Sequence, residues 1–107
     1  MNIALDWDGT YTRDPDAWRT FIRLFIAAGH SVWIVTARSE RTPVGPLPDG
    51  IKGVIYCDME SKKSVTDRND VEIHVWIDDE PIFIHKDAES VPILFPRDDA
   101  DDGAFKP

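Results

Sequence analysis

The chain has 107 residues, enough for one compact domain and too few for two. Hydrophobic residues make up 42% of it, so it can build a core, and its net charge of −8 at pH 7 disfavours an extended nucleic-acid-binding surface. A single cysteine excludes an internal disulfide and fits a reducing compartment, so we expect a cytoplasmic protein. No apolar run reaches the roughly 20 residues of a transmembrane helix, so no membrane partner is expected.

The first predicted elements are a buried strand and an amphipathic helix. Residues 3–5 form an apolar run that ends in the polar sequence Asp-Trp-Asp-Gly-Thr, which predicts a strand followed by a turn. Asp14 suits the N-cap of a helix whose first residue is Pro15, and Gly29 favours a helix end. Between them, apolar residues recur at the spacing of one helical face. These residues are Trp18, Phe21, Ile22 and Phe25.

The rest of the chain predicts more strands than helices. Further apolar runs indicate strands at residues 31–36, 54–57, 73–77 and 91–95. Residues 38–50 contain three prolines and two glycines, which predicts a loop, and residues 60–70 predict at most one short helix. We therefore expect an α/β domain with a mostly parallel five-stranded sheet over residues 1–97. An acidic, flexible tail is expected at residues 98–107.

Polar residues directly follow three of the predicted strands. Because the carboxyl ends of parallel strands lie at one edge of a sheet, we expect these side chains to meet there. They are Asp6, Asp8, Thr36, Asp78 and Asp79. Four carboxylates at one edge need a countercharge, and Mg²⁺ with oxygen ligands supplies it. A carboxylate can attack phosphorus, a second can transfer protons, and a hydroxyl and an ammonium can hold phosphate oxygens.

The order of these residues resembles four motifs of the haloacid dehalogenase superfamily. The motifs are Ile-Ala-Leu-Asp-Trp-Asp-Gly-Thr ending at Thr10, Trp-Ile-Val-Thr ending at Thr36, a lysine, and Val-Trp-Ile-Asp-Asp ending at Asp79. The resemblance implies a three-layer, Rossmann-like fold. It also implies a Mg²⁺-dependent phosphatase that hydrolyses phosphomonoesters through an aspartyl-phosphate.

The resemblance implies a role for each matching residue. Asp6 is the nucleophile, Asp8 the general acid and base, and Thr36 a phosphate ligand. The implied magnesium ligands are Asp6, the backbone carbonyl of Asp8, and Asp78, with Asp79 nearby or acting through water.

Two lysines fit the interval before the last motif. Neighbouring residues of a helix point about 100° apart, so only one of Lys62 and Lys63 can face the site, and we favour Lys63. The residues that flank the motifs complete the expected substrate-binding set, and they are Gly9, Thr10, Ala37 and Arg38. For Arg38, a contact with phosphate or substrate and an exposed, solvated position remain equally open.

The gaps between the motifs are too short to hold a cap domain. An open site suits a phosphate on a large or protruding substrate, such as a nucleic-acid end or a phosphoprotein. It also suits a nucleotide if a second copy of the chain, in a homo-oligomer, supplies a lid. The alternative interpretation is a non-catalytic or regulatory phosphate-binding module on the same scaffold.

Overall fold

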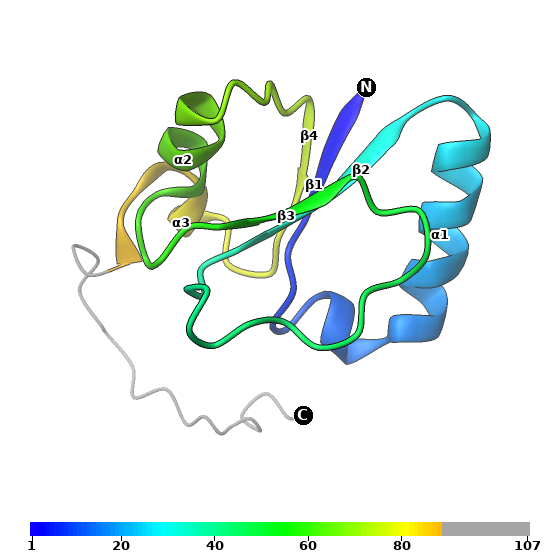
Figure 1. Cartoon of the computed structure of the whole chain (residues 1–107), viewed down its shortest axis with the longest axis horizontal. Coiled ribbons are helices and arrows are strands. Elements are labelled where there is room, and N and C mark those ends of the chain that lie inside the picture. The colour runs from blue at the N-terminus through cyan, green and yellow to red at the C-terminus, as the bar shows by residue number, and fades with distance from the viewer. Residues whose placement is uncertain (89–107) are drawn as a thin grey trace.

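Four parallel strands form the sheet on which the rest of the described chain is built (Figure 1). The computed structural model describes residues 1–88. The strands are β1 (Asn2–Leu5), β2 (Ser31–Thr36), β3 (Gly53–Tyr56) and β4 (Val75–Ile77), in the order β3-β2-β1-β4. The chain therefore runs outward from β1 to β3 and then crosses to the other side of β1. This change of direction places a topological switch point between β1 and β4.

The expected α/β class and parallel sheet are confirmed. Four of the five predicted strands form, and each overlaps its predicted range; the fifth, at residues 91–95, lies outside the described residues, as does the predicted acidic tail. Strand β4 starts at Val75, two residues later than predicted; just before it, the His74 amide donates to the Asn2 carbonyl at 2.8 Å, and the His74 ring accepts from the Asn2 amide at 2.8 Å. At this end of the β1–β4 pair, the Asn2 amide is therefore bonded to a side chain and the Asn2 carbonyl to the backbone.

Helix α1 (Pro15–Ala27) forms where the capping signals predicted it. The Asp14 carboxylate accepts a hydrogen bond from the amide of Ala17 at 3.3 Å. At the other end, Gly29 adopts a φ of +95°, which lets the backbone leave the helix in the left-handed conformation. The apolar face of α1 then covers one face of the sheet.

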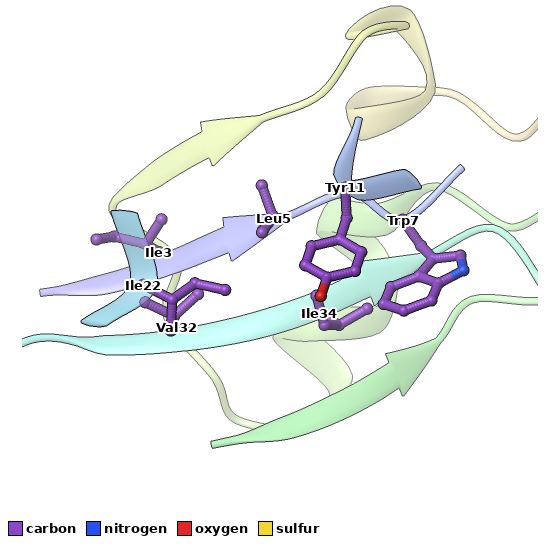
Figure 2. Close-up of a cluster of buried hydrophobic side chains, with 7 residues drawn as sticks. All are labelled: Ile3, Leu5, Trp7, Tyr11, Ile22, Val32 and Ile34. Carbon is purple, nitrogen blue, oxygen red and sulfur yellow. The ribbon is translucent and has the colours of Figure 1, made fainter. Parts of the chain in front are cut away.

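Each face of the sheet has its own core because side chains alternate along a strand. Figure 2 shows the cluster on the α1 side, which comprises Ile3, Leu5, Trp7, Tyr11, Ile22, Val32 and Ile34. On the other face, Val65 of α2 (Lys62–Arg68) packs with Ala4, Val35 and Ile55. The short helix α3 (Ile82–His85) lies beside α2, and a 3₁₀ turn, η1 (Tyr11–Arg13), follows β1 (Figure 1). No helix within residues 1–88 is long and apolar enough to cross a membrane.

The connection from β2 to β3 is a loop, as the prolines predicted, and it is attached to the domain at its middle. The amide of Val44 donates to the hydroxyl of Tyr56 at 3.2 Å, and the Val44 side chain packs on the α1-side core. Beneath the loop, the ring of Trp7 stacks on Tyr11 with a centroid distance of 4.6 Å. A Cβ added at Gly45 would lie 3.8 Å from the same indole ring. The loop is therefore held over the end of β1.

The core on the α1 side provides a direct test of the fold. Ile22 is 1% exposed, so Ile22→Ala should lower the free energy of unfolding by about 2–5 kcal/mol through lost burial and the cavity left behind. Leu24, on the same helix, is 63% exposed, so Leu24→Ala should change it by less than about 0.5 kcal/mol. Urea denaturation followed by circular dichroism measures both. Equal effects of the two variants would contradict this packing.

Candidate functional site

Three carboxylates meet at the carboxyl ends of β1 and β4. Asp6 directly follows β1, and Asp78 and Asp79 directly follow β4. The pairing of the two strands continues into the site, since the Asp6 amide donates to the carbonyl of Ile77 at 3.0 Å. Each aspartate offers one carboxylate oxygen, and the three oxygens lie within 4.8 Å of one another. Residues about 70 positions apart in the sequence thus form one acidic cluster, which we define as Asp6, Asp78 and Asp79.

A buried lysine at the start of α2 balances part of this charge. The Lys62 ammonium donates to Asp6 Oδ1 at 2.8 Å and to Asp78 Oδ2 at 2.5 Å. The side chains of all three residues are at most 8% exposed, so these are buried ion pairs. Three carboxylates against one ammonium leave two formal negative charges. An all-oxygen donor set with this excess fits a hard divalent cation such as Mg²⁺.

The choice of Lys63 for the site is corrected by the structure. The Lys63 ammonium is exposed and bonds both carboxylate oxygens of Asp67, at 2.9 and 2.7 Å. The physical reason is where α2 begins: Ser61 is its N-cap and accepts from the amide of Ser64 at 3.2 Å. Lys62 is then the first helical residue, and it shares the buried face with Val65, three positions on. That spacing is the signal in the sequence that identifies Lys62.

Burial changes the ionisation of the paired groups. Desolvation raises the pKa of Asp6 from its ordinary value of 3.8 to about 7, although the Lys62 ammonium opposes the rise. The neighbouring Asp79 and Asp78 raise the pKa of Asp6 further. For Lys62, burial lowers the pKa, but the attraction of Asp6 and Asp78 outweighs it, so the net shift is upward. Lys62 is therefore a permanent cation in this site.

Gly9 and Thr10 shape the acidic cluster from the turn after β1. Gly9 has a φ of +83°, and a Cβ at this position would lie 2.3 Å from Asp79 Oδ2, so only glycine fits. The Thr10 hydroxyl lies 3.2 Å from Asp6 Oδ2 and 3.4 Å from Asp79 Oδ1. The Gly9 amide donates to Thr12 Oγ1 and the Thr10 amide to the carbonyl of Trp7. The contacts of both residues support the cluster rather than leaving amides free for a ligand.

Thr36, Ala37 and Arg38 lie at the end of β2, next to β1. Thr36 is buried, and its hydroxyl oxygen accepts from the amide of Arg38 at 3.2 Å. The proton of this hydroxyl is still available to a ligand, since the oxygen is the acceptor in that bond. The Arg38 side chain is about one-third exposed, and its guanidinium is paired with Asp8. Sequence reasoning weighed two roles for Arg38 and missed this one.

The Asp8 carboxylate is held apart from the acidic cluster. Arg38 Nε donates to Asp8 Oδ2 at 2.9 Å, and Arg38 Nη2 donates to Asp8 Oδ1 at 2.8 Å. This bidentate pair is the strong form of an arginine–carboxylate contact. Beside it lies an open hollow of about 350 Å³. Its lining residues are Asp8, Ala37, Arg38, Ser39, Thr42, Asp58 and Met59.

Cys57 is close to the site and is chemically inert. Its side chain is 1% exposed, and desolvation raises the pKa of the thiol to about 12. The thiolate is the nucleophilic form of cysteine, so Cys57 serves the core and not the chemistry. The polar side chains at this edge include the carboxylates, Lys62 and Thr36.

The close approach of Gly9 to Asp79 leads to a matched pair of variants. Gly9→Ala should destabilise the protein by about 1–2 kcal/mol through its left-handed backbone and, in addition, displace the Asp79 carboxylate. Gly29 also has a positive φ, but nothing lies within 4 Å of a Cβ added there. Gly29→Ala should therefore destabilise the protein without disturbing the acidic cluster. Calorimetric titration with Mg²⁺ should show weaker binding for Gly9→Ala alone. Equal Mg²⁺ affinities in the two variants would contradict the contact with Asp79.

The raised pKa of Asp6 predicts how stability depends on pH. A folded pKa of about 7 against an unfolded value of 3.8 means that the folded metal-free protein binds the proton more tightly. The stabilisation from the protonated group is complete below about pH 4 and is lost as the pH rises through about 7. In EDTA, wild type should therefore lose about 2–4 kcal/mol relative to Asp6→Asn between these pH values. Urea denaturation across this pH range measures the difference, and parallel profiles would contradict it.

Comparison of the chain with protein-family models, curated proteins and solved structures gives no match. The resemblance noted from the sequence therefore rests on its motif residues. In the structure, Asp6, Asp78 and Asp79 follow parallel strands and Thr36 is the last residue of another, all at the same edge of the sheet.

Proposed function

We propose that this protein is a Mg²⁺-dependent phosphomonoester hydrolase of the haloacid dehalogenase type. The observation that carries the proposal is the buried Asp6 carboxylate, which is paired with Lys62 and adjoins Asp78 and Asp79 at the switch point between β1 and β4. Ligand sites of open α/β sheets lie at such points. A buried carboxylate beside a fixed ammonium is equipped to attack a dianionic phosphate.

The finer description of the fold belongs to the same proposal. Helices α1 and α2 pack on opposite faces of the sheet, which supports a three-layer, Rossmann-like arrangement (Figure 1). A fifth strand at residues 91–95 would complete the expected five-stranded sheet. The turn between Thr10 and α1 and the short segment around α2 support the capless form. A site without a cap admits a phosphate carried by a large substrate.

The acidic cluster and the backbone carbonyl of Asp8 would hold the Mg²⁺ ion. When bound, the ion supplies positive charge next to the phosphate oxygens and lowers the repulsion between phosphate and carboxylates. Its two charges equal the two that Lys62 leaves unbalanced in the cluster. The ion would also favour the ionised form of Asp6, whose pKa burial raises.

The reaction follows from the positions of the remaining groups. A carboxylate oxygen of Asp6 attacks phosphorus, and the bond from phosphorus to the ester oxygen breaks as Asp8 donates a proton to that oxygen. Lys62 and Thr36 hold the phosphate oxygens that do not react. Asp8 then takes a proton from water, the water oxygen attacks the aspartyl-phosphate, and inorganic phosphate leaves with Asp6 restored.

One observation favours a second candidate function. Asp8, the proton donor of this scheme, is fully engaged by Arg38. A site that only binds phosphate would have no need of a free carboxylate at that position. The alternative is therefore a non-catalytic or regulatory phosphate-binding module on the same scaffold.

The covalent mechanism is tested at Asp6. Wild type should release phosphate from at least one member of a panel of nucleotides, sugar phosphates, phosphopeptides and phosphorylated oligonucleotides, and only with Mg²⁺ present. Asp6→Asn should abolish the release and the acid-stable, hydroxylamine-sensitive protein phosphate that a rapid quench would trap. Phosphate binding without release by wild type would favour the binding module. Substantial turnover by Asp6→Asn would exclude the covalent route.

The two lysines provide a matched control within one helix. Lys62→Ala should lower kcat/KM by at least about 10²-fold, the usual scale for losing one electrostatic contact to the reacting group. Lys63→Ala should stay within about twofold of wild type because its ammonium bonds Asp67 in solvent. Circular dichroism in Mg²⁺ confirms that each variant is folded before its rate is compared. A larger loss at Lys63 would contradict the orientation of α2.

A further inference from the structure

Arg38 is fixed on two sides. Its Nη1 donates to the carbonyl of Pro43 at 2.7 Å and lies 3.4 Å from the carbonyl of Thr42. Its backbone amide is bonded to the hydroxyl of Thr36. The Nε and Nη2 groups form the opposite edge of the guanidinium, and this edge faces Asp8. The loop therefore positions the arginine without help from Asp8.

Asp8 is the member of the pair that is free to move. Within residues 1–88, Arg38 is the only partner of its carboxylate, and the Asp8 side chain is 56% exposed against 34% for Arg38. Both oxygens of the Asp8 carboxylate accept hydrogen bonds from the guanidinium, so the pair engages the whole carboxyl group. For Asp8 to protonate a leaving oxygen, it must part from Arg38. The Nε–H and Nη2–H groups of Arg38 then lack an acceptor.

We infer that Arg38 exchanges Asp8 for a second oxyanion carried on the leaving group of the substrate. The inference rests on the proposed phosphatase function and adds a substrate class to it. That class is a phosphomonoester whose leaving group bears another phosphate, a phosphodiester or a carboxylate. Binding of that group frees the Asp8 carboxylate, which then takes up from solvent the proton that it donates to the leaving oxygen. Recognition of the substrate and release of the Asp8 side chain are thus one event.

The surroundings of Arg38 explain why the oxyanion belongs to the leaving group. The transferred phosphoryl group lies opposite Asp6 and is held by Lys62 and Thr36. Arg38 instead borders the hollow, which extends along the loop over Ser39 and Thr42. A guanidinium edge matches the two adjacent oxygens of a phosphate or carboxylate.

The remaining lining residues set further requirements on the leaving group. Met59 contributes an exposed apolar side chain to the hollow, and Asp58 a carboxylate. Both hold a positive φ, of 69° and 51°, and their amides donate to the carbonyls of Ala37 and Arg38. Asp58 would repel an anion and accept a hydroxyl or amino donor instead. The second oxyanion is therefore assigned to Arg38, with an uncharged portion of the leaving group beside Asp58.

Kinetics on matched substrates test the inference. A series of alkanediol bisphosphates of increasing chain length is compared with the corresponding hydroxyalkyl monophosphates, which differ only in the second phosphate. For the best spacing, wild type should prefer the bisphosphate by about ten- to hundredfold in kcat/KM, the worth of a charge-assisted contact. Arg38→Ala should reduce this ratio to about the twofold statistical value. Arg38→Lys should restore only part of it because an ammonium cannot present two parallel donors.

A control from the same loop and a binding measurement complete the test. Arg41 is exposed, so Arg41→Ala should keep the wild-type ratio. In Asp6→Asn, which cannot turn over, the bisphosphate should shift the Arg38 Nε–H and Asp8 carboxyl NMR signals, and the monophosphate should leave the Nε–H signal in place. A wild-type ratio near unity at every spacing, or a ratio that survives in Arg38→Ala, would overturn the inference. If no phosphomonoester is hydrolysed but the bisphosphate still shifts both signals, the phosphatase proposal fails and the exchange at Arg38 stands.

Discussion

The contact of one buried ammonium with two buried carboxylates is the interaction on which the rest of this site depends. Lys62 joins the first residue of α2 to the ends of β1 and β4, so a single side chain links three elements. Removing one partner of a buried ion pair costs about 3–5 kcal/mol because the other charge is left uncompensated. One ammonium cannot balance the charge of all three carboxylates of the cluster, so an excess of negative charge remains at the sheet edge. The fold therefore leaves a net negative charge at this site, which suits a cation.

The topology of the sheet explains why these groups meet at all. Asp6 and Asp78 lie far apart in the sequence, but β1 and β4 are neighbours because the chain crosses to the far side of β1 after β3. The parallel register of Leu5 with Ile77 brings the two following aspartates to the same level. Helix α2 lies in this crossover, which is why the lysine at its first position reaches both carboxylates (Figure 1). The strand ends bring the aspartates together, and the turn that holds Gly9 and Thr10 then shapes the cluster.

Features with a local cause could be predicted from the sequence, and features set by long-range geometry could not. The caps and apolar spacing predicted α1, and apolar runs predicted β1 to β4, because these signals act within a few residues. The convergence of aspartates followed from a general property of parallel sheets. The lysine was misassigned because its direction depends on where α2 begins, and a shift of one residue turns a side chain by about 100°. The pairing of Asp8 with Arg38 joins two loops and has no local signature.

The loop after β2 provides a hydrogen-bond acceptor for Arg38 that a helix in its place would not provide. A helix in this position would use its own backbone carbonyls for internal hydrogen bonds. Proline disfavours such a helix because it has no backbone N–H to donate and its ring clashes with the preceding turn. In the loop that the three prolines enforce, the carbonyl of Pro43 is left to accept from Arg38 Nη1 at 2.7 Å. The guanidinium is thereby anchored from behind while its other edge faces Asp8. A regular α/β connection would have offered Arg38 no such anchor, so the proline-rich segment is what makes this arginine a fixed group at the edge of the sheet that holds the acidic cluster.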